Sequence, residues 1–341
     1  MRCETSVSRQ TRGTGSTVRS TSSSDRWSGG ESREWLAAHL RAWERHRVTF
    51  GVTSWAIPES TQVFRAGCID VEPDGLPLPG AMRRYAEQIP QGFAFTVMLS
   101  DDTLVYRFPY GHPDRGRRGE LNPGFLDPGP LQERMCAALD VLDGTLDTVV
   151  LQLQPVYRTE ELRAPEFVSR LDCFLGGLPR AYRYAVDLRT PAFNVPEYRA
   201  CLRDHGVAHL LHHAPHLPHP SPEAPSLIDQ LLTPGIFSVP FCVARVHAGP
   251  ECDHDDEALT LGIHELIRAC GDEGAALTVF VDESRDGGGA NRGEQDRRDG
   301  GRGSRDHDDG GTMPVIPVLT RLLHSLNGEL ARRSPLRRRA A

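Results

Sequence analysis

The stretch YRYAVDLRTPAF begins as an apolar run and ends in an acid and a base two residues apart, Asp187 and Arg189. In a β-strand, side chains two residues apart point to the same face. The opposite face of this run carries Tyr184, Val186 and Leu188, which suits packing against helices. The pattern predicts a buried strand that delivers a carboxylate and a guanidinium to a polar site at its end.

Four other apolar runs end in the same way, with polar or aromatic residues on one shared face. The pairs are Thr53 and Trp55, Asp70 and Glu72, Gln152 and Gln154, and Arg245 and His247. Barrels of parallel strands bring the carboxyl ends of their strands together at one rim, where barrel enzymes place their chemistry. We therefore expect one polar pocket, with the apolar face of each strand turned outward.

The residue types in this pocket suggest three kinds of chemistry. Arg189 and Arg245 would bind a phosphate or carboxylate bidentately. The carboxylates could act as a general base or hold a hard divalent cation, and His247 could transfer a proton. The competing interpretation is that acids and bases at a barrel mouth only pair with each other or cap the next helix. We expect catalytic roles for Asp187, Arg189, His247 and Asp70, and ligand contacts from Trp55, Glu72, Gln152 and Arg245.

Histidines are concentrated in the stretch DHGVAHLLHHAPHLPH, which starts at Asp204. A metal site there would need carboxylate or further imidazole ligands from other strands. His213, at the tip of its strand, is the candidate ligand, with Asp187 and His247 as neighbours. The other histidines lie in a Pro-rich loop without regular ligand spacing, and a solvated His-rich loop is the alternative. A divalent metal is thus the one cofactor that the sequence suggests.

The composition excludes some functions. The formal net charge is −7, from 39 basic and 46 acidic residues, which argues mildly against a protein that coats nucleic acid. Every basic residue is an arginine, so Schiff-base or general-base chemistry on a lysine is excluded. The 8 cysteines have no C-x-x-C spacing, which suits a reducing compartment. No apolar run is long enough to span a membrane, so a cytoplasmic protein without membrane contact is expected.

From residue 47 onward, apolar β-rich runs alternate with helical patterns. The eight predicted strands are 47–53, 67–72, 93–99, 148–154, 182–188, 207–213, 241–247 and 277–283. Apolar stripes with helical spacing lie between them, at 131–142 and 167–175, and one more follows at 315–326. Eight strands that alternate with helices predict an α/β fold, a closed TIM-like (β/α) barrel of parallel strands.

The ends of the chain differ in composition from this core. Residues 1–30 are rich in Ser, Thr, Arg and Gly and are expected to be disordered, and an amphipathic helix is predicted over 31–46. The barrel domain spans 47–330, with a Gly/Asp/Arg-rich insertion at 286–311, and a basic tail follows at 331–341. The connection between the first two strands has room for about two helical turns, which predicts a shortened first crossover.

Six segments in order resemble one family. They read FGVTSW, YAEQIPQGFAFTV, VVLQLQP, LPRAYRYAVDLRTPAF, YRACLRDHGVA and VARVHAG, and they are distributed across residues 47–283. Together they resemble the YecE-like proteins, domain of unknown function 72 (DUF72). The resemblance implies a TIM-like barrel and defines no reaction.

The sequence departs from this family's pattern at several positions. Asp70 and Asp187 stand where the family has glutamates, Met98 where it usually has lysine, and Phe193 where it has tryptophan. One hypothesis is an enzyme that hydrolyses or isomerises an anionic small molecule or phosphodiester by acid–base or metal-assisted chemistry. The alternative is a degenerate barrel that keeps the pocket as a ligand-binding or interaction module. Protein partners are not indicated.

Overall fold

The computed structural model describes residues 31–53, 58–71, 79–142, 144–213, 225–248, 253–283, 319–320 and 322–326. The predicted tails 1–30 and 331–341 and the predicted insertion 286–311 lie outside these residues. So do Trp55 and Glu72, two of the predicted ligand contacts.

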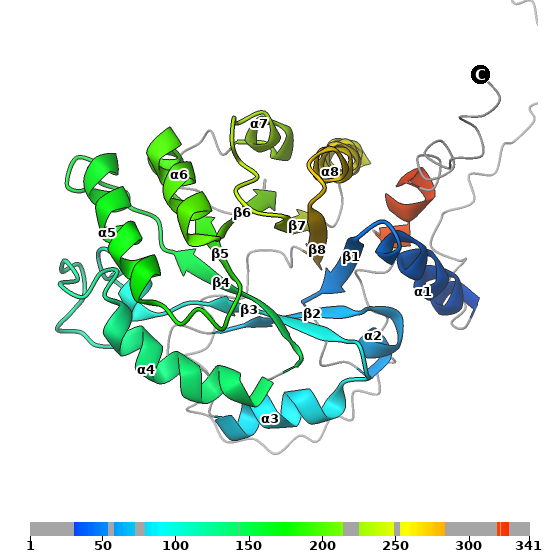
Figure 1. Cartoon of the computed structure of the whole chain (residues 1–341), viewed down its shortest axis with the longest axis horizontal. Coiled ribbons are helices and arrows are strands. Elements are labelled where there is room, and N and C mark those ends of the chain that lie inside the picture. The colour runs from blue at the N-terminus through cyan, green and yellow to red at the C-terminus, as the bar shows by residue number, and fades with distance from the viewer. Residues whose placement is uncertain are drawn as a thin grey trace, which may run out of the picture.

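Eight parallel strands form a closed barrel in sequence order, and β1 pairs with β8 to close it (Figure 1). The strands are β1 (Val48–Val52), β2 (Ala66–Asp70), β3 (Ala94–Leu99), β4 (Leu146–Leu153), β5 (Tyr184–Leu188), β6 (Ala208–His213), β7 (Phe241–Ala248) and β8 (Ala276–Glu283). Each coincides with a predicted strand to within about two residues. The prediction of a TIM-like barrel is confirmed.

Helices surround the strands on the outside of the ring (Figure 1). They are α1 (Glu31–Glu44), α2 (Pro58–Val63), α3 (Pro79–Gln88), α4 (Pro128–Leu139), α5 (Ala164–Gly177), α6 (Pro196–His205), α7 (Leu227–Leu231) and α8 (Asp253–Asp272). Local signals set their ends. Asp127 caps the start of α4 just before Pro128, and Gly206, with φ of 70°, ends α6 in the left-handed conformation.

The first crossover is short, as its length predicted. Helix α2 has 6 residues, and α1 packs beside it and against β1. The amphipathic face of α1 supplies Leu36, Leu40 and Trp43, all buried in the outer core. The helical residues 322–326 lie beside both α1 and α8, because His324 stacks on Trp35 and the Ser325 hydroxyl lies 3.3 Å from His264 Nε2.

Strand alternation divides the core into two parts. The outer face of each strand joins the large apolar cluster beneath the helices. The inner face forms a separate cluster that fills the middle of the barrel, made of Ala66, Cys68, Met98, Val150, Ala185, Ala208, Leu210, Val243 and Phe280. Above it, toward the carboxyl ends of the strands, the inward side chains become polar.

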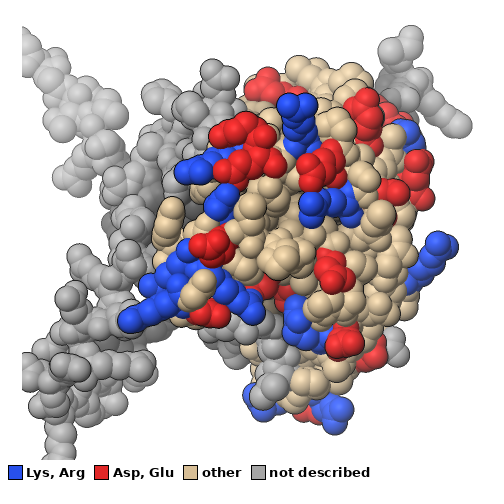
Figure 2. Space-filling view, turned by 90° about the vertical axis from the view of Figure 1, so that its left-hand side faces the viewer, with Lys and Arg blue, Asp and Glu red and all other residues tan. Residues whose placement is uncertain are grey.

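No helix of the described residues is long and apolar enough to cross a membrane. On the face that Figure 2 shows, acidic and basic side chains are interspersed over most of the surface, and basic side chains gather toward one edge. Among the described residues on this face, acidic side chains interrupt the basic ones, so no continuous basic surface forms there.

Candidate functional site

The polar layer at the carboxyl rim of the barrel contains most of the predicted site residues. Strand register places them side by side: Gln152 pairs with Asp187, His212 with Arg245, and His247 with Asp282. We call Asp70, Asp187, Arg189, Arg245, His247 and Asp282 the rim cluster. Because the middle of the barrel is filled with apolar side chains, the rim cluster is closed off from the opposite end.

Arg245 is the centre of the rim cluster. Its guanidinium donates two parallel hydrogen bonds of 2.9 Å to the Asp70 carboxylate and one of 2.7 Å to Asp282 Oδ2. The Arg245 side chain is 10% exposed and that of Asp70 is 47% exposed. The buried Arg245 Nε has no hydrogen-bond partner among the residues that the structure describes. Burial acts to lower the pKa of Arg245, but the charges of Asp70 and Asp282 together outweigh it and hold the pKa above its usual value.

His247 is a buried, neutral imidazole beside this ion-pair network. Burial, followed by the charge of Arg245, lowers its pKa to about 4, although Asp282 acts in the opposite direction. His247 Nδ1 lies 3.6 Å from Asp282 Oδ2, and the His212 ring meets the His247 ring edge to face at 5.2 Å. At neutral pH this imidazole is therefore unprotonated, and a pKa of about 4 makes it a weak base.

Asp187 and Arg189 form a further ion pair of the rim, separate from the contacts of Arg245, at the end of β5. The Arg189 Nε donates a 2.7 Å hydrogen bond to Asp187 Oδ2. Asp187 is almost fully buried, whereas the Arg189 side chain is 24% exposed. Asp187 thus has a charged partner inside the barrel, and part of the Arg189 guanidinium remains open to solvent.

Two inward residues just below the rim have no acid–base role. Burial, and then the Asp70 carboxylate, raises the pKa of the Cys68 thiol well above its usual value, so Cys68 stays protonated. Met98, which pairs with Asp70 in the β2–β3 register, is fully buried in the inner cluster.

The predicted metal ligand His213 lies on the other face of β6. Its neighbour Leu211 belongs to the outer cluster and Leu210 to the inner one, so alternation turns His212, not His213, toward His247. The sequence predicted the inward face for His213, whereas the register gives that face to His212. Among the described residues, Asp187, His213 and His247 do not bring their ligand atoms within 4.8 Å of one another.

Sequence reasoning missed two members of the polar layer, Asp282 and His212. Asp282 follows the apolar run of β8 just as Asp187 follows that of β5, so the same strand-end signal was available. It also accepts a 3.0 Å hydrogen bond from the Thr53 hydroxyl, which joins the first strand to the last at the rim.

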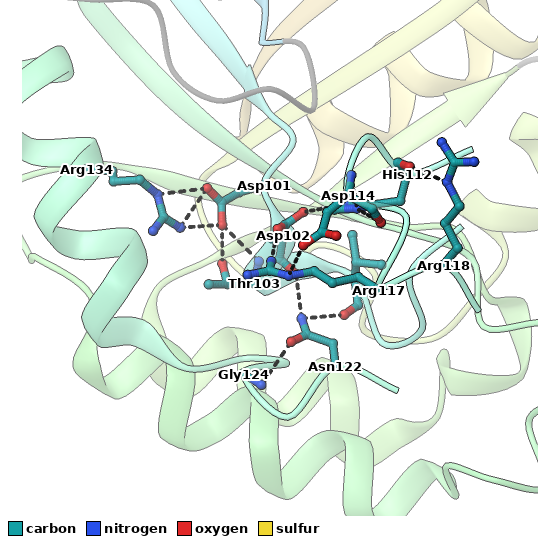
Figure 3. Close-up of polar contacts among 11 residues, drawn as sticks. Asp101, Asp102, Thr103, His112, Asp114, Arg117, Arg118, Asn122, Gly124 and Arg134 are labelled. Carbon is teal, nitrogen blue, oxygen red and sulfur yellow. Dashed lines mark hydrogen bonds and ion pairs between the residues drawn. The ribbon is translucent and has the colours of Figure 1, made fainter. Parts of the chain in front are cut away.

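The connection from β3 to α4 is a further feature that the sequence argument did not predict. It starts at the rim and is folded by its own polar contacts (Figure 3). Buried Asp101 accepts hydrogen bonds from the Thr103 backbone and hydroxyl and is held bidentately by Arg134. The Asn122 amide donates to the carbonyls of Asp102 and Val105 at 2.7 and 2.9 Å. This ordered segment covers the β3–β4 side of the rim.

The structure also contains a cavity at the opposite, amino-terminal end of the barrel. Its volume is about 490 Å³, and Thr49, Thr96, Thr278, Arg65 and Asp147 are among its lining residues. Barrel folds reserve this end for stability and the other for chemistry, so the cavity does not replace the rim cluster as the candidate site.

A family model and several solved structures are similar to this chain. The family model described as "protein of unknown function DUF72" matches residues 61–295. A comparison with curated proteins finds no match. Similar solved structures include a DUF72 family protein from Thermotoga maritima, with 17% identity, a TM-score of 0.47 and coverage of 69% of this chain and 92% of that one.

Two further solved structures are similar at lower identity. A DUF72 family protein from Enterococcus faecalis has 12% identity, a TM-score of 0.44 and coverage of 71% of this chain and 92% of its own. A psychrophilic glycoside hydrolase family 10 endo-β-1,4-xylanase has 9% identity, a TM-score of 0.43 and coverage of 72% and 88%. The DUF72 family model matches more than half of the residues of this chain, so the chain belongs to the DUF72 family of proteins of unknown function.

Proposed function

We propose that the rim cluster binds a small molecule through an anionic group, a phosphate or a carboxylate, and that the barrel hydrolyses this ligand by acid–base chemistry. The family defines no reaction, so the proposal rests on the geometry of the rim. It assigns a separate role to each charged group there.

The bidentate hydrogen bonding of Arg245 is the observation on which the proposal rests. Its two terminal nitrogens already hold a carboxylate in the bidentate geometry that a phosphate or carboxylate ligand would use. That carboxylate, Asp70, is half exposed at the end of β2, whereas Asp282 on the other side is mostly buried. A ligand anion would displace Asp70 and leave the Arg245–Asp282 pair in place.

The remaining groups supply the acid–base steps. His247 Nδ1 lies 3.6 Å from Asp282 Oδ2. In the tautomer that carries its proton on Nδ1, Nε2 would accept a proton from an attacking water. Arg189 gives a second cationic contact, and Asp187 positions it. Gln152, which pairs with Asp187 in the register, would donate a hydrogen bond to the ligand. Trp55 and Glu72 remain predicted contacts outside the described residues.

Binding is tested with inorganic phosphate by isothermal titration calorimetry. We expect wild type to bind and Arg245→Gln to lose binding. The matched control is Arg170→Gln, which breaks a surface pair with Glu166 on α5 and leaves the rim unchanged. Thermal unfolding verifies that each variant is folded, and Arg189→Gln, at a more exposed position, gives a second readout with weaker binding. Equal phosphate affinity in wild type, Arg245→Gln and Arg189→Gln would refute the anion site.

Turnover is tested separately with bis(p-nitrophenyl) phosphate and p-nitrophenyl phosphate, with and without a chelator. The proposal predicts hydrolysis that survives chelation and falls by about 100-fold or more in His247→Gln. Phosphate affinity should stay unchanged in this variant. Hydrolysis that the chelator abolishes would show instead that a metal, held by rim carboxylates, activates the water.

A second candidate is a barrel that binds a ligand without transforming it. One observation favours it. Met98 is buried beside Asp70, where the family resemblance leads one to expect lysine. Phosphate binding by wild type with no turnover of either ester would support this function.

A further inference from the structure

Three potential metal ligands converge outside the barrel, where α5 packs against α6 (Figure 1). Cys201 and His205 are four residues apart on α6, so they lie on one face of that helix, and Asp172 comes from α5. His205 Nε2 lies 2.8 Å from Asp172 Oδ1, and Cys201 Sγ lies 4.0 Å from the same oxygen. In the part of the chain that the structure describes, no other group of three such residues brings its ligand atoms within 4.8 Å of one another.

The geometry is close to that of a tetrahedral metal site. Metal–ligand bonds of about 2.0–2.3 Å at tetrahedral angles place ligand atoms roughly 3.3–3.8 Å apart. The observed distances of 2.8 and 4.0 Å lie on either side of this range, so small rotations of the side chains would equalise them. The Asp172 side chain is 62% exposed, which gives an ion a route from solvent to the buried Cys201.

The donor set indicates which ion would bind. One thiolate, one imidazole and one carboxylate are ligands of Zn²⁺ and similar transition-metal ions, whereas Mg²⁺ and Ca²⁺ prefer oxygen alone. We infer that Asp172, Cys201 and His205 bind one zinc-class divalent ion, with water in the fourth position, and that the ion links α5 to α6.

The ordinary explanation is a surface ion pair between His205 and Asp172. Such pairs contribute little to the stability of the fold. An ion pair between His205 and Asp172 also does not explain why the buried Cys201 lies beside the Asp172 carboxylate. A dication would bind Cys201 as the thiolate: the Cys201 proton leaves to solvent, and metal bonds replace the Asp172–His205 hydrogen bond.

Cobalt(II) titration of the full-length protein tests the inference, because its spectrum reports the ligand type. We expect about one equivalent of Co²⁺ to produce tetrahedral d–d bands and a near-ultraviolet thiolate-to-cobalt charge-transfer band, and Zn²⁺ to displace it. Cys201→Ser should abolish the charge-transfer band. His205→Gln and Asp172→Asn should weaken binding about tenfold or more, since even changes outside the ligand shell have effects of that size.

The control is Cys173→Ser, which removes an exposed thiol next to Asp172 in the sequence but outside the group. This variant should keep the full spectrum. Cobalt bound by the histidines of residues 209–219 would give no thiolate band, so the two sites are distinguished. Circular dichroism checks the fold, and the more exposed His205→Gln decides the matter if Cys201→Ser misfolds. A wild-type spectrum without the thiolate band, or the same band in Cys201→Ser, would overturn the inference.

Discussion

At the residue scale, the rim depends on one arginine that joins strands far apart in the sequence. Arg245 on β7 contacts Asp70 on β2 and Asp282 on β8, so a single guanidinium ties three strands together. A charged group this buried is stable because carboxylates compensate it. The same ion pairs hold the Arg245 guanidinium in a fixed position, where a ligand anion can bind it.

The low pKa of His247 predicts a stability that depends on pH. The unfolded histidine titrates near its usual value of about 6.5, and the folded one has a pKa of about 4. Between these values the unfolded state binds the proton and the folded state does not, so stability falls as the pH drops from about 6.5 to about 4. In His247→Asn this loss should shrink by on the order of 2 kcal/mol.

Urea unfolding at a series of pH values measures this effect. His209, buried and hydrogen-bonded to the Tyr198 hydroxyl, also has a pKa lowered to about 4 and keeps part of the acid loss in the variant. The exposed His46→Asn is the control and should leave the profile unchanged. An identical acid loss in His247→Asn and wild type would show that His247 is not held neutral.

The alternation of side chains along each strand predicted much of the rim from the sequence. It turned Asp187, Arg245 and His247 inward, because an apolar opposite face identifies the side that packs on helices. It could not predict that Arg245 pairs with Asp70, because β2 and β7 are not neighbours and the contact depends on the width of the barrel. His213 was chosen over His212 because two adjacent histidines end that strand, and only the register distinguishes them.

At the element scale, the β3–α4 connection depends on a few buried polar groups. Asp101→Ala removes the cap of η2 (Asp102–Leu104) and all three hydrogen bonds from Arg134, at a position 5% exposed. We expect it to destabilise the protein by on the order of 3 kcal/mol. Asp127→Ala, which removes the exposed cap of α4, should cost only about 1 kcal/mol. Chemical unfolding compares the two, and equal losses would mean that the Asp101 network does not stabilise the connection.

The sequence predicted regular elements better than this connection. The strands and α4, α5 and α1 show clear periodicity. The segment 100–127 has none, because its fold comes from specific side-chain to backbone bonds such as those of Asn122 (Figure 3). Such bonds leave no repeating signal in the sequence.

At the scale of the whole molecule, the barrel interior is packed in its middle and polar at its upper end. Gly51 on β1 permits this packing, because a Cβ there would lie 2.4 Å from the Phe280 ring. Gly51→Ala should therefore destabilise the barrel by about 1–3 kcal/mol. Gly80→Ala in α3, where a Cβ would meet nothing within 4 Å, should stay within about 1 kcal/mol of wild type.

Thermal and urea unfolding of both glycine variants test this packing. A Gly51→Ala variant as stable as Gly80→Ala would mean that Phe280 does not fill the space above Gly51. The interior would then be looser than described, and the rim would not be isolated from the cavity at the other end.

The most direct test of the proposed rim site is the phosphate affinity of Asp70→Asn. If a ligand anion replaces Asp70 on Arg245, removing the competing carboxylate should strengthen phosphate binding relative to wild type. Glu166→Gln, which removes the carboxylate of a surface arginine pair on α5, should leave the affinity unchanged. Isothermal titration calorimetry at constant salt measures all three proteins. A higher affinity only in Asp70→Asn is the predicted result, and an unchanged or lower affinity would contradict the anion site at Arg245.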